Sequence, residues 1–572
     1  MSGEAYGGGA VALVIVATVL IGAFALRLSR TTSDFYVASR TVSPVWNASA
    51  IGGEYLSAAS FLGVAGLILT YGADMLWFPV GYTAGYLVLL VLVSAPLRRS
   101  GAYTLPDFAE ARLESRPVRR IAGVLVVTIG WLYLLPQFVG AGLTVRLATG
   151  APGWVGGLLV AAVVVFSVAT GGMRSITFVQ AFQYWLKLTA LAVPMVFLLL
   201  AWRGDGLPGP GDGPPTFADR TTVTVPQDQR FVVRRAVAVL VTGTLDGTTY
   251  DGQRLSLDTG EHVVRASARL TFPAGAVVPH SESITPSDND SWSTPLSGAG
   301  GRDHPVYATY SLILALFFGT MGLPHVLVRF YTNPDGRAAR RTTLIVLCLL
   351  GAFYLFPTAY GALARVYTTD LLMTGRADTA VLQLPERLVG GVGGDLLTAL
   401  VTAGAFAAFL STSSGLTVSV AGVLSQDVLR GSVRDFRLAA ALAVLVPFGL
   451  SLVATRLPVA DVVGLAFAVA ASSFCPLLVL GIWWRRLTSV GAATGLLVGG
   501  GLATAAVSAT IAGVDRDGWT GALLAQPAAW TVPIAFAVMV GVSLRTPSRV
   551  PANVGRTMVR LHAPESLALT DR

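Results

Sequence analysis

Ionisable and hydroxyl side chains occur inside several long apolar segments of this 572-residue chain. Glu54 lies in the middle of the segment 46–63, directly after Gly52 and Gly53. An acidic side chain near mid-span costs about 2.5–3.5 kcal/mol on insertion scales, and it normally faces a bundle interior or a wet cavity. The two glycines predict a helix interrupted at Gly52 and Gly53, since unwound backbone at membrane depth needs partners from protein, water or a ligand. A packing kink with a hydrogen-bonded Glu54 is the alternative.

The segment 319–325 repeats this feature, because it holds Gly319, Gly322, Pro324 and His325 within an apolar run. Proline removes one hydrogen bond from a helix, so we expect a second interrupted helix here. We interpret His325 as a structural or gating residue rather than a proton carrier, since it lies near the end of the run.

A hydroxyl-rich run, 407–417, lies in a third apolar segment. Ala408, Ser411 and Thr412 follow i, i+3, i+4 spacing and therefore share one helix face. Oxygen ligands suit a hard cation. Together with carbonyl groups freed at Gly53 and Leu56, this face predicts a site for one monovalent cation, with ligands from two carbonyls, a third carbonyl of Ala408 and two hydroxyls. A seam of small residues between helices is the alternative for the run on its own.

Lys187 is the single lysine of the chain and lies about 16 Å into its apolar segment, at 1.5 Å per helical residue. We expect it to face the bundle, where Glu54 is a possible charge partner, although a boundary error of one turn would let it reach the membrane interface. Half-helix ends at the two interruptions offer polarised backbone groups that suit a small carboxylate. Candidate substrate-binding residues are Ser57, Ser60, Tyr133, Gln137, Gly319 and Thr320.

Composition identifies a polytopic membrane protein: 53% of residues are hydrophobic and 12% are charged, against about 25% charged in ordinary globular domains. The net charge of +9 comes from arginines in short loops, so it indicates topology rather than nucleic-acid binding. The two cysteines and five histidines show no ligand spacing, which predicts neither a disulfide nor a transition-metal site. We expect no cofactor other than a coupling ion.

The apolar segments predict about thirteen membrane spans of roughly 20 residues each. They lie near residues 9–26, 44–70, 75–97, 121–146, 154–171, 176–201, 306–328, 342–366, 395–425, 438–456, 461–483, 488–512 and 526–544. Odd-numbered spans are followed by arginine-rich loops. The loop after the first span, for example, holds Arg27, Arg30 and Arg40, and Arg329, Arg337, Arg340 and Arg341 follow the seventh span. This pattern predicts a multi-pass cell-membrane protein with the N-terminus outside and the C-terminus in the cytoplasm.

Two sets of five spans carry interrupted helices of opposite direction at corresponding positions, which is typical of inverted-repeat secondary transporters. The predicted parts are a first span with its loop (1–43), a first repeat (44–202), an extracellular insertion (203–304), a second repeat (305–486), two further spans (487–545) and a cytoplasmic tail (546–572). Short alternating valine-rich runs bounded by Asp-Gly turns predict that the insertion is β-rich. We regard it as a loop elaboration rather than a ligand-binding module.

Several motifs resemble those of the sodium:solute symporter family, and within it the branch of bacterial cation/acetate and monocarboxylate permeases. They are Gly171-Gly-Met-Arg-Ser175, Tyr55-Leu-Ser-Ala-Ala-Ser-Phe-Leu-Gly63, Thr104-Leu-Pro-Asp-Phe108, Gly319-Thr-Met-Gly-Leu-Pro-His-Val326 and the run Gly404 to Asp427. The resemblance spans Thr32 to Pro547 without the insertion. It implies the leucine-transporter fold and a sodium site at Gly53, Leu56, Ala408, Ser411 and Thr412. The hydroxyl pair Ser411 and Thr412 departs from the acetate-permease pattern and is similar to that of proline and sugar carriers.

We therefore expect an all-α membrane symporter, not an enzyme, that couples inward sodium movement to uptake of a small organic solute. A short-chain monocarboxylate such as acetate, propionate or pyruvate is the expected substrate. A sodium symporter for proline, a sugar or another neutral or zwitterionic solute is the first alternative. A membrane receptor with an extracellular sensing module is the second. The cytoplasmic loops hold no ATPase motif, so transport is predicted to be secondary.

Overall fold

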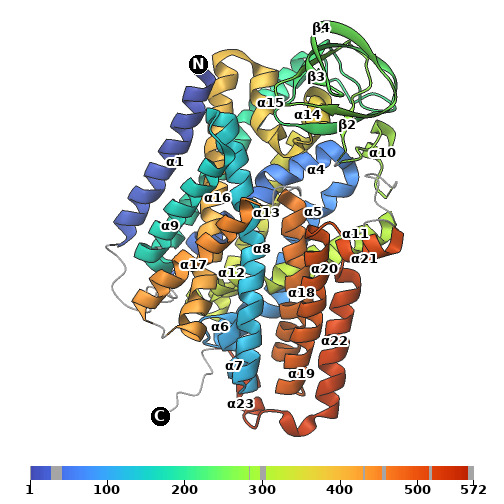
Figure 1. Ribbon diagram of the computed structural model, residues 1–572. Coiled ribbons are helices and arrows are strands. Elements are labelled where there is room, and N and C mark those ends of the chain that lie inside the picture. The colour runs from blue at the N-terminus through green and yellow to red at the C-terminus, as the bar shows by residue number, and fades with distance from the viewer. Residues whose placement is uncertain are drawn as a thin grey trace.

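The computed structural model describes residues 2–26, 41–282, 284–296, 304–429, 432–453, 459–514 and 518–564. Its described part is a bundle of long helices with a small sheet at one end, hereafter the sheet end (Figure 1). Helix α1 (Ser2–Leu26) begins at the sheet end, and α23 (Val554–His562), the last described helix, lies at the opposite end of the bundle (Figure 1). The loop predicted to hold Arg27, Arg30 and Arg40 lies outside the described residues.

Helices occupy all thirteen predicted spans. Within the described residues, ten helical stretches are long and apolar enough to cross a membrane. Two of these, 59–99 and Gly153–Gly204, each cover two predicted crossings, because a turn divides the first and a kink the second. The kink lies at Gly172, whose φ of 59° favours glycine. The remaining span corresponds to α17 (Val433–Ser451). The apolar pattern therefore located the helices correctly.

The first set of spans contains a broken helix. Helix α3 runs through Gly52 and Gly53 and ends at Tyr55, so the prediction of unwinding at the glycines is wrong by about one turn. A Cβ added at Gly53 would lie 2.2 Å from the carbonyl oxygen of Gln180, so this glycine serves close helix packing instead. The elements of this set are α3 (Pro44–Tyr55), η2 (Ala59–Gly63), α4 (Val64–Tyr71), η3 (Gly72–Leu76), α5 (Trp77–Val88), η4 (Leu89–Val93), α6 (Ser94–Arg99), α7 (Leu105–Leu113), α8 (Arg116–Thr149) and α9 (Gly153–Gly204).

The second set contains the other predicted break. Helix α11 ends at Gly322, Leu323 is extended, and α12 begins at Pro324. Gly319 lies against α18, where an added Cβ would be 2.5 Å from the Phe467 carbonyl oxygen. The elements are α11 (Pro305–Gly322), α12 (Pro324–Val328), η5 (Arg329–Thr332), α13 (Gly336–Tyr367), α14 (Asp370–Thr374), η6 (Ala377–Thr379), α15 (Ala380–Val389), α16 (Gly391–Val423), η7 (Leu424–Val428), α17 and α18 (Val459–Trp483).

The C-terminal elements pack on one side of the two sets, where α22 contacts α18 and α19. A helix also forms within the predicted tail: α23 lies against α6, and the Arg99 Nη1 donates to the His562 carbonyl oxygen over 3.2 Å. These elements are α19 (Ser489–Gly495), η8 (Leu496–Gly500), α20 (Gly501–Ile511), α21 (Gly518–Ala525), α22 (Ala528–Arg545), η9 (Pro547–Arg549) and α23 (Val554–His562).

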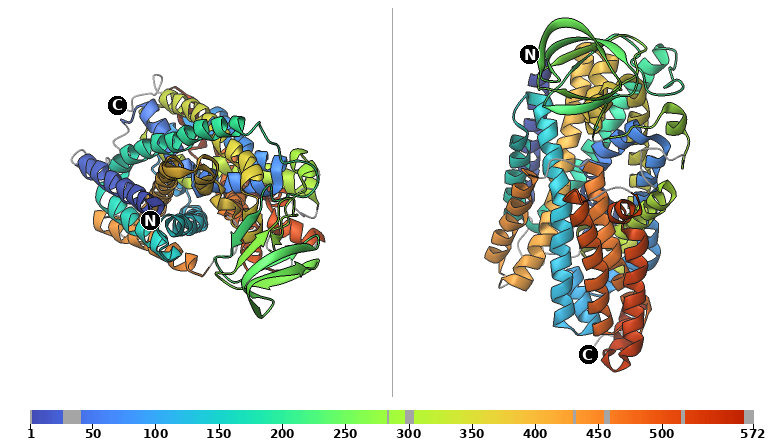
Figure 2. Two further views of the ribbon diagram at one scale, coloured as in Figure 1. Left: turned by 90° about the horizontal axis from the view of Figure 1, so that it is seen from above. Right: turned by 45° about the vertical axis from the view of Figure 1, so that its right-hand side comes forward.

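The predicted β-rich insertion is confirmed as a seven-stranded antiparallel sheet above one side of the bundle (Figure 2). The strands run in the order β1-β6-β3-β5-β2-β7, with β4 paired to β3. Buried Arg365, near the end of α13, connects insertion and bundle by donating to Asn289 on α10 (Asn289–Ser293) and to the Leu69 carbonyl. The strands are β1 (Thr221–Thr224), β2 (Gln229–Val233), β3 (Val237–Leu245), β4 (Thr248–Leu257), β5 (Gly260–Val264), β6 (Arg269–Phe272) and β7 (His280–Ser281).

Candidate functional site

Helix α3 ends inside the bundle, where its last carbonyl groups have no partners within the helix. Side chains from two other helices satisfy them. Ser411 Oγ of α16 donates to the Gly53 carbonyl oxygen over 2.7 Å, and Thr412 Oγ1 donates to the Glu54 carbonyl oxygen over 2.6 Å. Lys187 Nζ of α9 donates to the Gly53 carbonyl and, over 2.7 Å, to the Leu56 carbonyl. The carbonyl oxygens at the break are therefore not free, because they accept hydrogen bonds from these side chains.

The residues predicted to bind a cation do lie together. Ser411 Oγ lies 2.7 Å from the Gly53 carbonyl oxygen and 3.1 Å from that of Ala408. Thr412 is adjacent but directs its hydroxyl to Glu54. All of these residues are buried in the bundle. The sequence therefore placed the correct faces of α3 and α16 opposite each other.

The centre of this cluster is the Lys187 ammonium group. Its nitrogen contacts the Gly53 and Leu56 carbonyls, and it also donates to Ser411 Oγ over 2.6 Å. The lysine side chain is fully buried. A sodium ion bound by the same three oxygens would need the position of the ammonium nitrogen. The residues as arranged therefore do not fit sodium at this point.

Glu54 forms its ion pair with Arg329 rather than with Lys187, which the sequence offered as a possible charge partner. The Arg329 Nε lies 2.7 Å from Glu54 Oε2, and both side chains are at most 2% exposed. Arg329 also donates to Thr177 over 2.8 Å and to the side-chain oxygen of Gln180, both on α9. Sequence reasoning missed Arg329 because it treated this arginine as part of a basic loop. In the structure α12 continues into η5, which buries it.

Three of the residues predicted to bind substrate already have partners within the protein. Ser60 Oγ lies 2.8 Å from the Tyr354 hydroxyl, and Thr320 Oγ1 lies 2.8 Å from the Tyr55 hydroxyl. Gln137 Oε1 accepts from the Ala58 backbone N–H over 3.1 Å, so it satisfies a donor that the break exposes. These contacts hold the two broken helices and α8 together.

The other predicted residues lie around the same core. Ser57 is buried at the break itself, and Gly319 lies against α18. The Tyr133 ring stands edge-on to the His325 ring, with centroids 5.2 Å apart. The side-chain nitrogens of His325 have no hydrogen-bond partner among the described residues. The predicted substrate residues thus form one neighbourhood between the broken helices, α8 and α18.

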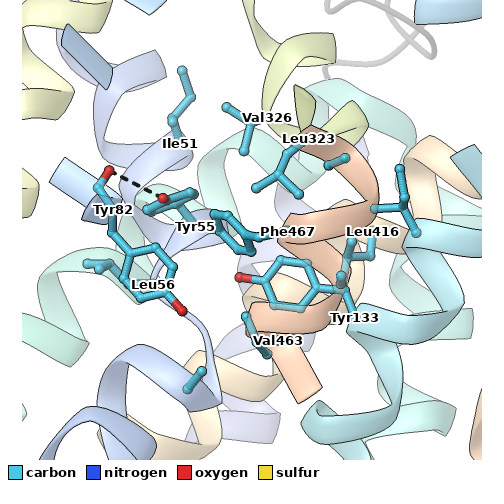
Figure 3. Close-up of a cluster of buried hydrophobic side chains, with 14 of the residues drawn as sticks. Ile51, Tyr55, Leu56, Tyr82, Tyr133, Leu323, Val326, Leu416, Val463 and Phe467 are labelled. Atoms are coloured by element: carbon cyan, nitrogen blue, oxygen red, sulfur yellow. Dashed lines mark hydrogen bonds between the residues drawn. The ribbon is translucent and has the colours of Figure 1, made fainter. Parts of the chain in front are cut away.

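An aromatic cluster in this neighbourhood escaped prediction (Figure 3). The Tyr55 ring lies edge-on to Tyr82 and Tyr86, with centroids 5.9 and 4.9 Å away, and Phe467 lies 5.0 Å from Tyr82. The hydroxyl groups of Tyr82 and Tyr86 are buried without hydrogen-bond partners in the described part of the chain. Their i, i+4 spacing in span 3 was the available signal, since it places both rings on one face.

A cavity of about 390 Å³ opens at the sheet end. Its charged lining residues are Arg146 at the end of α8, Arg376 before η6 and Asp378 in η6. Burial and the neighbouring Arg146 lower the pKa of Arg376, whereas burial raises the pKa of Asp378 to about 6. The predicted substrate residues lie outside the lining of this cavity. The cavity therefore approaches the broken helices without reaching the residues that the sequence singled out.

Relatives of this chain are symporters. The uncharacterized symporter YwcA of Bacillus subtilis is 29% identical over 91% of both chains. An uncharacterized symporter of Cupriavidus necator is 28% identical, over 91% of this chain and 88% of its own length.

Two solved structures share the fold. A Na+-coupled sialic acid symporter in a substrate-bound outward-open state aligns with a TM-score of 0.58 and 14% identity, over 94% of this chain and 98% of its own. Mhp1, a nucleobase-cation-symport-1 family transporter, aligns with a TM-score of 0.50 and 11% identity, over 93% and 99%. They confirm the predicted fold class, a leucine-transporter-like membrane protein with two inverted repeats.

The model of the sodium:solute symporter family matches residues 35–206 and 276–499, and so covers both sets of five spans. The unmatched residues between these ranges contain β1 to β6. Membership of this family implies an integral membrane transporter, rather than an enzyme, with sodium as the coupling ion. On the evidence of this match, of its symporter relatives and of its fold, the chain belongs to the sodium:solute symporter family.

Proposed function

We propose that this symporter takes up a short-chain monocarboxylate, such as acetate, propionate or pyruvate. The observation that carries the proposal is the balance of charge inside the bundle. Glu54 and Arg329 neutralise each other, whereas the Lys187 ammonium contacts, among the residues that the structure describes, only uncharged oxygens. Burying an ion without a counter-ion is costly, so the excess positive charge favours an anionic ligand in the same core.

The uncharged groups of the core suit a small carboxylate. Tyr82 and Tyr86 offer buried hydroxyl donors, and His325 offers ring nitrogens that lack partners among the described residues. A carboxylate accepts hydrogen bonds and makes stronger ones than a neutral acceptor does. The surrounding rings of Tyr55 and Phe467 give a close apolar wall for a short chain. These groups support a small solute better than a large one.

The charged residues that line the cavity at the sheet end also favour a negatively charged solute. Arg146 and Arg376 line it, and Asp378 is the one acidic residue among the described residues of its lining. With the predicted orientation this cavity faces the outside, where two arginines would raise the local concentration of anions. A zwitterionic or neutral solute would gain less from this field.

Uptake of labelled acetate, propionate and pyruvate into proteoliposomes, with and without an inward sodium gradient, tests the proposal. We expect each acid to inhibit uptake of the others. If galactose or proline inhibits while the three acids do not, the carboxylate assignment is wrong, although symport of another solute stands. Absence of uphill flux of any tested solute would favour a receptor instead.

A further inference from the structure

We infer that Lys187 is a built-in cation that takes the place of sodium between α3 and α16. The inference rests on the proposed function only in taking the chain to be a sodium-coupled symporter. It starts from the three contacts of the ammonium nitrogen with Gly53, Leu56 and Ser411. These are three of the five residues that the sequence predicts as sodium ligands.

The number of donors matches the number of acceptors. An ammonium group has three N–H donors and no acceptor, and Nζ here contacts two carbonyl oxygens and one hydroxyl oxygen. Ser411 can accept from Lys187 because its own proton is directed to the Gly53 or Ala408 carbonyl. The lysine therefore completes a hydrogen-bonded set and leaves none of these oxygens for another cation.

Lysine is better suited than arginine to replace a bound sodium ion at this position. Every other Lys or Arg position in the sequence is arginine, and the single lysine lies at this buried position. The planar guanidinium of arginine carries five donors in a fixed fork, whereas ammonium is a point charge on a flexible stem. The C-terminal end of α3 adds a favourable negative partial charge beside it.

The surrounding packing holds the ammonium in place. The Gln180 side chain, two turns before Lys187 on α9, donates to the Ser411 carbonyl oxygen over 2.8 Å. The Gly53 backbone lies so close to α9 that an added Cβ would clash with Gln180. Because the ammonium nitrogen already occupies the Gly53, Leu56 and Ser411 oxygens where α3, α9 and α16 meet, a tethered ammonium can bridge these helices where a bound sodium ion would otherwise do so. A coupling sodium ion then binds at another place in the protein.

The test measures binding of radiolabelled sodium to purified full-length protein, with N-methyl-D-glucamine replacing sodium at constant chloride. Lys187→Ala removes the ammonium and exposes the three oxygens, so we expect it to gain saturable binding of about one sodium ion per protein. The double variant Lys187→Ala/Ser411→Ala should lose this gain. Ser411→Ala alone should bind as much sodium as the wild type, because the inference assigns no sodium to this oxygen while the lysine is present.

A second measurement uses the wild-type protein, so it does not depend on the folding of a variant. Isotope-labelled lysine gives one side-chain signal, since Lys187 is the only lysine. We expect that signal to stay unchanged when sodium replaces N-methyl-D-glucamine. A sodium-dependent shift, together with wild-type sodium binding that Ser411→Ala abolishes, would overturn the inference. Failure of acetate, propionate and pyruvate to compete would reject the proposed substrate and leave this result unaffected.

Discussion

The buried pair of Glu54 and Arg329 allows a quantitative prediction. In Glu54→Gln the Arg329 guanidinium keeps its contacts with Thr177 and Gln180 but loses the one carboxylate partner that it has in the described part of the chain. Breaking a buried ion pair by removing one partner costs about 3–5 kcal/mol. Since about 1.4 kcal/mol corresponds to a factor of ten, the ratio of folded to unfolded protein should fall roughly a hundred-fold to a few thousand-fold.

Titration with SDS in mixed micelles, followed by loss of helical signal, measures this free energy. The double variant Glu54→Gln/Arg329→Gln removes both charges, so its loss should be smaller than the sum of the two single losses. Asp370→Asn is the matched control. It breaks the partly exposed pair of Asp370 with Arg387, and such pairs contribute about 0–1 kcal/mol. If Glu54→Gln were no more destabilising than Asp370→Asn, the reasoning from burial would be refuted.

Three further predictions concern topology, pH and packing. In a cysteine-free background, an impermeant reagent added to intact cells should label Asp251→Cys and spare Glu114→Cys; the reverse pattern would invert the predicted orientation. The folded-state pKa of Asp378, about 6, lies above the usual value near 3.8. Its contribution to stability is therefore fully present below pH 3.8 and is lost as pH rises through 6. Asp378→Asn should flatten the dependence of melting temperature on pH between about 4 and 6, the window set by these two pKa values. Gly53→Ala places a Cβ 2.2 Å from a carbonyl oxygen of α9, so the yield of monodisperse protein should collapse, whereas Gly449→Ala meets no atom within 4 Å and should match the wild type.

The sequence was sufficient to locate the membrane spans, because a membrane helix is specified locally by the length of an apolar run. The sequence was insufficient to locate the break in α3, because a pair of glycines can have either of two structural roles. They permit unwinding, and they also permit close approach of helices, as Gly53 does against Gln180. Only the position of α9 distinguishes these uses, and that position is a tertiary property. The break accordingly lies at Leu56, after the glycines.

The partners of the buried charged residues could not be predicted for the same reason, because they too depend on tertiary structure. Lys187 and the oxygen-bearing face of α16 were both identified, but no local pattern sets how two distant helices rotate toward each other. A rotation that directs Lys187 to Glu54 and one that directs it to the carbonyls of α3 are equally consistent with the sequence. Arg329 was assigned to a loop because positive charges after a span usually indicate topology. In the structure it is 1% exposed and forms the ion pair with Glu54, for which the sequence offered Lys187 as a possible partner.

These contacts have unequal consequences for a transporter that must open alternately at its two ends. Tyr55 and Thr320 join the two broken helices through a single hydrogen bond between neutral groups, 2.8 Å long. Glu54 and Arg329 join α3 to η5 through a buried ion pair. Separating neutral hydrogen-bonded groups costs about 1 kcal/mol when water replaces each partner, whereas separating buried charges costs more unless water enters with the opening. Any motion that parts α3 from η5 must therefore hydrate Glu54 and Arg329 as it proceeds, while the cavity at the sheet end is lined by neither of them.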